Sequence, residues 1–156
     1  MTTLMSGSLL GFALQSSKAD NLLAQFGGNW TGTGKITVEN GSSERIRCRA
    51  NNKADGKSLG LNLRCASDSY KFELSSDIAS SDSGALSGSW NENTRGVFGS
   101  LSGKATPGVI QATASAVGFS ASLSIRQSGP SLSVLMRSPG SEISEVSISM
   151  AKGGGK

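Results

Sequence analysis

Apolar and polar residues alternate along most of this chain, and short breaks of glycine, proline, asparagine and aspartate interrupt the alternation. The clearest run places Phe119, Ala121, Leu123 and Ile125 on one face and serines on the other. A period of two residues is that of a β-strand with one buried and one solvated face. The pattern predicts about ten strands, at residues 30–38, 44–50, 58–66, 70–74, 86–91, 97–103, 110–116, 119–125, 132–136 and 146–150.

The breaks between these runs fit tight turns that join successive strands. Asn40-Gly41 is typical of a type I′ hairpin turn, in which both residues take positive φ, and Asp55-Gly56 marks the next turn. Strands joined in this way pair in sequence order, and a sheet of about ten strands tends to curl and close. We expect an all-β fold, an antiparallel up-and-down β-barrel of about ten strands with a short N-terminal helix. A two-sheet β-sandwich is the alternative.

The N-terminal residues depart from the alternation. Residues 4–14 form an apolar stretch, and Ser17-Lys18-Ala19 sets small residues where a signal peptidase prefers them. The stretch is too short to span a bilayer. We therefore expect a signal-peptide-like segment at 1–19, a short helix at 20–27, the barrel domain at 28–151 and a flexible tail at 152–156. A periplasmic or secreted protein follows; a packed helix at 1–19 in a cytoplasmic protein is the alternative.

Composition and charge limit the classes of function that this chain can have. The apolar fraction of 36% is low, but the regular period of two predicts a folded domain. The net charge of +4 is too small to indicate a nucleic-acid binder. The chain contains no histidine, which excludes a Ser-His-Asp triad, an imidazole base and His-liganded metal. We expect a non-enzymatic protein with no catalytic residue, no metal and no cofactor.

The two cysteines fall on the apolar faces of two neighbouring predicted strands. Cys48 and Cys65 stand directly opposite each other if the hairpin is centred between Gly56 and Lys57. The pair therefore predicts a cross-strand disulfide, which agrees with export to an oxidising compartment. Two buried thiols in a reducing cytosol are the alternative.

The same register concentrates positive charge on the opposite face of these strands. Arg49 would face Arg64, and like charges directly opposite each other are destabilising unless carboxylates or a bound anion compensate them. A solvated face balanced by Glu44 and Asp68 is one interpretation, and a site for an anionic lipid or glycan is the other. The candidate anion patch comprises Arg45, Arg47, Arg49 and Arg64.

Aromatic residues and glycines share the faces that are predicted to point inward. The glycines either make room for the two tryptophans or leave a cavity, and alternating small and large residues favour a filled barrel. A cavity would be apolar and would suit a hydrophobic small molecule. Its candidate lining residues are Trp30, Phe72, Trp90 and Phe119.

Two short motifs resemble those of known barrel families. Gly28-Asn29-Trp30 resembles the Gly-x-Trp signature of lipocalin-type barrels, and Gly88-Ser89-Trp90 also resembles the strand openings of avidin-type barrels. The lipocalin resemblance implies that Trp30 plugs the closed end and packs against a basic residue of a late strand, for which Arg126 and Arg137 are candidates. The avidin resemblance does not extend to a biotin site, which requires more tryptophans than two.

Three longer segments, residues 44–50, 63–70 and 88–95, together resemble small exported alphaproteobacterial proteins of unassigned function. This resemblance implies a bacterial envelope setting and supplies no activity. We expect an exported barrel that binds a hydrophobic small molecule or an anionic envelope component. The alternative is a structural or protein-interaction barrel with a filled core.

Overall fold

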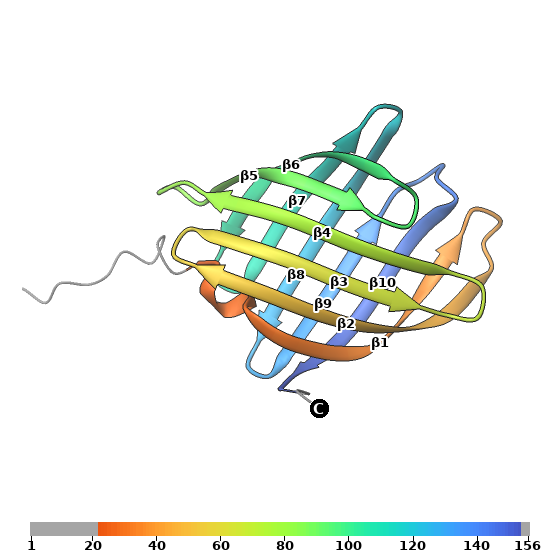
Figure 1. Ribbon diagram of the computed structural model, residues 1–156, viewed down its shortest axis with the longest axis horizontal. Helices are drawn as coiled ribbons and strands as arrows, with labels where there is room; N and C mark the ends of the chain where they lie inside the picture. The colour runs from red at the N-terminus through yellow and green to blue at the C-terminus, as the bar shows by residue number, and fades with distance from the viewer. Residues whose placement is uncertain (1–21, 154–156) are drawn as a thin grey trace, which may run out of the picture.

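A computed structural model describes residues 22–153, which form a closed barrel of ten antiparallel strands (Figure 1). Each strand pairs with the next in sequence, and β1 pairs with β10 to close the barrel. The predicted up-and-down barrel is confirmed and the β-sandwich is not observed. The strands are β1 (Gly28–Val38), β2 (Ser43–Asp55), β3 (Ser58–Ala66), β4 (Lys71–Ser80), β5 (Ala85–Glu92), β6 (Val97–Thr106), β7 (Val109–Ala116), β8 (Phe119–Ser128), β9 (Ser131–Arg137) and β10 (Ile143–Lys152).

The chain enters the barrel through a single 3₁₀ turn, η2 (Ala24–Phe26), and not through the longer helix predicted at 20–27. Leu23 and Phe26 are both fully buried. Residues three apart lie on the same side of a 3₁₀ helix, so one turn is enough to direct both side chains into the barrel. The predicted signal-like segment at 1–19, residues 20 and 21, and residues 154–156 lie outside the described residues.

The first hairpin turn differs from the predicted type I′ turn. Gly41 has φ +88°, but no residue other than glycine has positive φ in the described part of the chain, Asn40 included. The Asn40 side chain instead accepts hydrogen bonds from the main-chain N–H of Ser42 at 2.9 Å and from its hydroxyl at 2.6 Å. This Asx-type arrangement satisfies the turn without the strained left-handed conformation that the type I′ turn requires of an asparagine.

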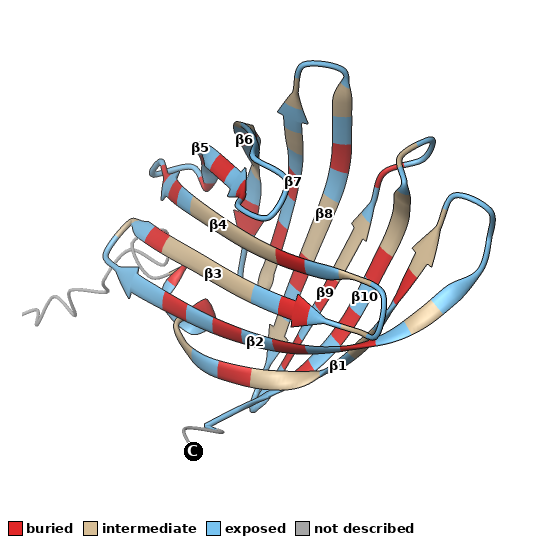
Figure 2. Ribbon diagram, turned by 45° about the vertical axis from the view of Figure 1, so that its right-hand side comes forward, coloured by how far each residue is buried: buried red, intermediate tan, exposed pale blue. Residues whose placement is uncertain are grey.

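Burial alternates along the strands as the sequence predicts (Figure 2). On β2, Ile46, Cys48 and Ala50 are buried, whereas the arginines between them are exposed. The inward side chains of all ten strands form one hydrophobic core in the described residues. The barrel therefore has a dry interior and a polar outer wall.

The inward glycines allow neighbouring strands to approach each other closely. A Cβ added to Gly32 would lie 1.9 Å from the Ser149 carbonyl oxygen, and one added to Gly88 would lie 2.1 Å from the Asp77 carbonyl oxygen. Gly34, Gly99 and Gly103 meet neighbouring carbonyls in the same way. The glycines therefore allow the wall to curve. The sequence pattern predicts that they either make room for the tryptophans or leave a cavity, and it does not predict this role.

This role predicts that Gly88→Ala destabilises the barrel by about 2 kcal/mol or more, because a main-chain carbonyl must move to admit the methyl group. Urea unfolding followed by tryptophan fluorescence measures the loss. Gly60→Ala is the matched control, since the nearest atom to its added Cβ is 3.8 Å away. Equal unfolding free energies for the two variants would contradict the interpretation.

Candidate ligand-binding cavity inside the barrel

One end of the barrel is closed by hydrogen bonds that converge on the 3₁₀ turn. The carbonyl oxygen of Phe26 accepts a hydrogen bond from Trp30 Nε1 at 3.3 Å and another from Asn52 Nδ2 at 3.0 Å. Asn52 is buried, and its Oδ1 accepts a hydrogen bond from the main-chain N–H of Asn62 at 3.3 Å. Trp30 itself is completely buried. The indole and the asparagine thus hold η2 against the inside of the wall.

The cation that packs on Trp30 is Lys152, whose Nζ lies 5.3 Å from the ring centroid. It is neither Arg126 nor Arg137, the two candidates from the sequence; the Arg137 side chain pairs with Glu145 at 2.9 Å. Lys152 belongs to β10, whereas the sequence pattern placed it in a flexible tail. Closure of β10 onto β1, with Trp30 opposite Lys152, brings the two together.

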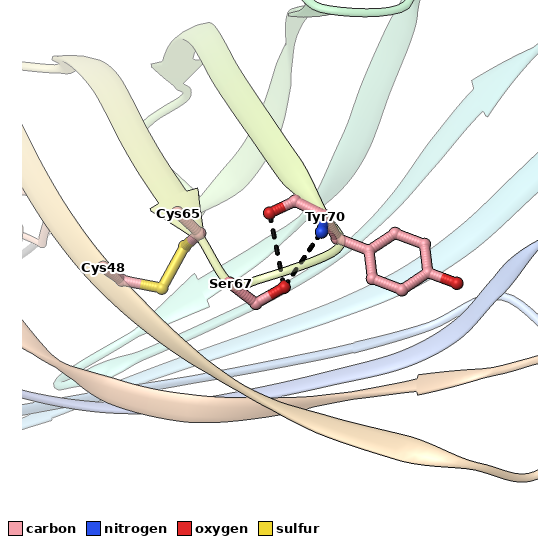
Figure 3. The surroundings of a disulfide bond; sticks show 4 residues. All are labelled: Cys48, Cys65, Ser67 and Tyr70. Carbon is pink, nitrogen blue, oxygen red and sulfur yellow. Dashed lines mark hydrogen bonds between the residues drawn. A yellow bond between two sulfur atoms is a disulfide. The ribbon is translucent and has the colours of Figure 1, made fainter.

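The predicted cysteine register is observed. Cys48 stands opposite Cys65 with their Cα atoms 4.2 Å apart, and a disulfide joins them (Figure 3). Beyond Cys65, Ser67 closes the turn into β4, because its hydroxyl donates to the Tyr70 carbonyl at 3.3 Å and accepts from the Tyr70 N–H at 3.0 Å. The disulfide therefore links β2 to β3 just before this turn.

A cavity of about 310 Å³ occupies the barrel interior. Three of the candidate lining residues, Phe72, Trp90 and Phe119, border this cavity, and the Trp90 and Phe119 ring centroids are 5.6 Å apart. The fourth candidate, Trp30, does not line it, because its indole is buried in the hydrogen-bond network around η2 that closes one end of the barrel. Leucines from several strands complete the wall, among them Leu61, Leu63, Leu74, Leu101, Leu123 and Leu132.

Polar atoms that border the cavity are bonded to the wall. Trp90 Nε1 donates to the Ser100 carbonyl oxygen at 3.0 Å, and the Ser76 hydroxyl donates to the Ser89 carbonyl oxygen at 2.7 Å. No buried side-chain nitrogen or oxygen lacks a hydrogen bond in the described part of the chain. The cavity therefore offers a ligand apolar surface and little hydrogen bonding.

A charged pair stands at the cavity mouth. Glu92, 9% exposed, accepts hydrogen bonds from Arg95 at 3.0 Å, from the Thr94 hydroxyl at 2.5 Å and from the main-chain N–H of Glu73 at 2.9 Å. Burial by itself raises the pKa of Glu92, but these hydrogen bonds outweigh it and hold the pKa below its ordinary value. The carboxylate is therefore ionised at neutral pH, and its hydrogen bonds to Thr94 and Arg95 hold the turn between β5 and β6 in place.

Sequence inspection missed Asn52, Glu92 and Arg95 as cavity residues. Asn52 continues the buried alternating positions of β2, and Glu92 does the same after Trp90 on β5. A polar residue at an inward position of a strand could have indicated both. Their roles could not be predicted, because their hydrogen-bond partners come from other segments, Phe26 of η2 for Asn52 and Glu73 of β4 for Glu92.

The candidate anion patch lies outside the barrel and does not contact the cavity. All four arginines are exposed, and Arg49 stands opposite Arg64 as predicted. None of them forms an ion pair with another residue in 22–153. Glu44, expected to balance them, instead accepts a hydrogen bond from the Ser69 N–H at 2.8 Å.

No group of three or more acidic or cysteine side chains within 22–153 is placed to hold a metal ion. No helix within that range is long and apolar enough to cross a membrane.

Comparisons with known proteins show a shared fold. No family model and no curated protein matches the chain. Among solved structures, the S-type phycobiliprotein lyase CPES from Guillardia theta is similar, with a TM-score of 0.57 and 11% sequence identity over 91% of this chain and 99% of that chain. At this identity the similarity concerns the barrel fold alone. The resemblance to exported alphaproteobacterial proteins stays a prediction.

The similar solved structure bears on the expectation that this protein is not an enzyme. It is a lyase, so this barrel architecture also occurs in an enzyme. A fold does not by itself distinguish binding from catalysis. The chemistry of the cavity has to make that distinction.

Removal of the disulfide should lower the free energy of unfolding by about 3 kcal/mol, because the bond closes a loop with a sequence separation of 17 residues in the unfolded chain. Urea unfolding with and without a reducing agent measures the change. The Cys48→Ala, Cys65→Ala double variant should have about the same free energy of unfolding as the reduced protein, and adding the reducing agent should not change it. A parent protein equally stable in both conditions would refute the prediction.

Glu92→Gln should cost about 1–3 kcal/mol at pH 7, since it removes hydrogen bonds to a charged group. A carboxyl whose folded-state pKa is lowered stabilises the fold above its ordinary value of 4.5, and this stabilisation is lost as the pH falls through the folded-state pKa. The difference between parent and variant should therefore shrink from pH 7 to pH 3. Glu142→Gln, an exposed change near the same mouth, should differ little from the parent at either pH. A pH-independent loss in Glu92→Gln would contradict the charge-based account.

Proposed function

We propose that this protein binds a hydrophobic small molecule inside its barrel. The observation that carries the proposal is the cavity of about 310 Å³, which has aromatic and aliphatic walls and whose neighbouring polar atoms are bonded elsewhere. Apolar cavities of this size are typical of small-ligand sites. The same cavity argues against the alternative of a structural barrel with a filled core.

The cavity volume bounds the ligand. A dry cavity of about 150 Å³ binds benzene, so a cavity about twice as large has room for a two-ring aromatic compound or a short acyl chain. The charged groups of the lining stand at the mouth, in Glu92, Arg95 and Glu142. A polar end of the ligand would lie there, and its apolar body would lie against Trp90 and Phe119.

Binding without catalysis is the function that this chemistry favours. Glu92 accepts hydrogen bonds from several donors, which makes it a poor proton acceptor. The disulfide supports an oxidising compartment, in keeping with an exported protein. The shared fold with a phycobiliprotein lyase is compatible with a small-molecule site and does not specify the ligand.

Titration with 1-naphthylamine, a neutral two-ring fluorophore, tests the proposal. We expect saturable binding of one molecule per chain, with energy transfer from Trp90. Ala114→Phe should weaken binding at least tenfold, because Ala114 lines the cavity and the added ring would occupy space that a two-ring ligand needs. Ser115→Phe adds the same ring one position away, on the exposed face, and should bind like the parent.

Two results would overturn the proposal. One is the absence of saturable binding by the parent protein. The other is equal binding by Ala114→Phe and the parent while circular dichroism shows both folded, which would place the fluorophore elsewhere. Native mass spectrometry of protein purified from its own host then identifies the natural ligand.

A further inference from the structure

A second hollow lies on the outer wall of the barrel, over strands β1 to β4. It has a volume of about 790 Å³, and charged and amide side chains form much of its surface. Its lining shares Ala50, Leu61, Ser75 and Ser76 with the interior cavity but lacks the aromatic residues Trp90 and Phe119. Its polar lining comes mainly from the exposed faces of β2 and β3. We call it the outer groove, defined by Arg49, Asn51, Lys53, Asn62, Arg64 and Asp77.

The outer groove lies where β2 and β3 separate. Their ladder pairs Ala50 with Leu63 and then resumes only at Lys53 with Gly60, so it skips the positions of Asn51 and Asn52. The Asn52 side chain bridges the interruption from inside, because it binds the Asn62 N–H and the Phe26 carbonyl together. The network that closes the barrel end thus lies at the interruption of the β2–β3 ladder, beneath the groove.

Positive charge is in excess at this opening. Arg49, Arg64 and Lys53 line the outer groove, and Asp77 is its one carboxylate among the described residues. Arg49 and Arg64 stand opposite each other without an ion pair in the described part of the chain. Such a pair is destabilising by itself, and a bound anion would relieve the repulsion. The adjoining disulfide holds both strands in this register.

The polar neighbours of these cations indicate what kind of anion fits. Asn51, Asn62 and Ser75 add amide and hydroxyl groups, which hydrogen-bond to hydroxyls. Two guanidinium groups suit a carboxylate or another oxyanion. The volume exceeds what a single inorganic ion needs. We propose that the outer groove binds an acidic saccharide, with Arg49 and Arg64 on its carboxylate and the amides on its hydroxyls.

The four arginines of the candidate anion patch then differ in role. Arg49 and Arg64 line the outer groove, whereas Arg45 and Arg47 do not, although they share the exposed face of β2. The chain therefore supplies its own control. Two double variants can remove the same charge, one by altering the outer groove and the other by leaving it intact.

Isothermal titration with tri-galacturonate, inorganic phosphate and phosphatidylglycerol vesicles tests the site. Tri-galacturonate should bind, and Arg49→Gln, Arg64→Gln should weaken its binding at least tenfold. Arg45→Gln, Arg47→Gln removes the same charge and should change the affinity by less than about twofold. Chemical-shift changes on titration should include the side-chain amides of Asn51 and Asn62. Ala114→Phe, which narrows the interior cavity and does not line the outer groove, should bind the saccharide like the parent, so this site and the cavity are tested separately.

Three outcomes would overturn the assignment. Equal losses in the two double variants would mean attraction by general charge and not by the outer groove. Binding of phosphate or of the vesicles with no binding of tri-galacturonate would reject a saccharide in favour of an inorganic or lipid anion. No binding of any of the three probes would reject the groove as an anion site.

Discussion

Every other feature of this barrel depends on how closely its neighbouring strands approach one another. Closing the sheet leaves no free strand edge in the described residues, since β1 pairs with β10. The curvature brings carbonyl oxygens to within about 2 Å of where a Cβ would stand at Gly32 and Gly88. Glycine is required at these positions because only a hydrogen atom fits there. The same residues therefore determine the curvature of the wall and the width of the interior.

The two ends of the barrel use their polar groups in opposite ways. At the closed end, Trp30 and Asn52 both donate to the Phe26 carbonyl, so a buried hydrogen-bond network replaces empty space. Toward the other end, no segment packs against the inward aromatic residues Trp90 and Phe119 in this way, and a cavity remains beside them. Because buried polar groups must be bonded, those near the cavity are satisfied by the wall itself. What is left for a ligand is an apolar surface.

The wall between β2 and β3 separates two distinct environments. Its inner face carries the disulfide and the apolar lining, and its outer face carries exposed arginines. Asn52 connects the two, since its contacts inside the barrel coincide with the interruption of the β2–β3 ladder. A single buried amide thus takes part in the closed end and lies at the interruption beneath the outer groove.

Local rules were enough to predict the strands, their buried faces and the pairing of Cys48 with Cys65, because a period of two and a short turn fix register between adjacent strands. The opposition of Arg49 and Arg64 followed from the same register. The cation on Trp30, the bonding of Asn52 and Glu92, and the reason for the inward glycines could not be predicted, since each depends on a neighbour from another segment. The size of the cavity and the opening in the wall depend on the diameter and closure of the whole barrel. Those are properties of all ten strands together, and only the tertiary structure decided them.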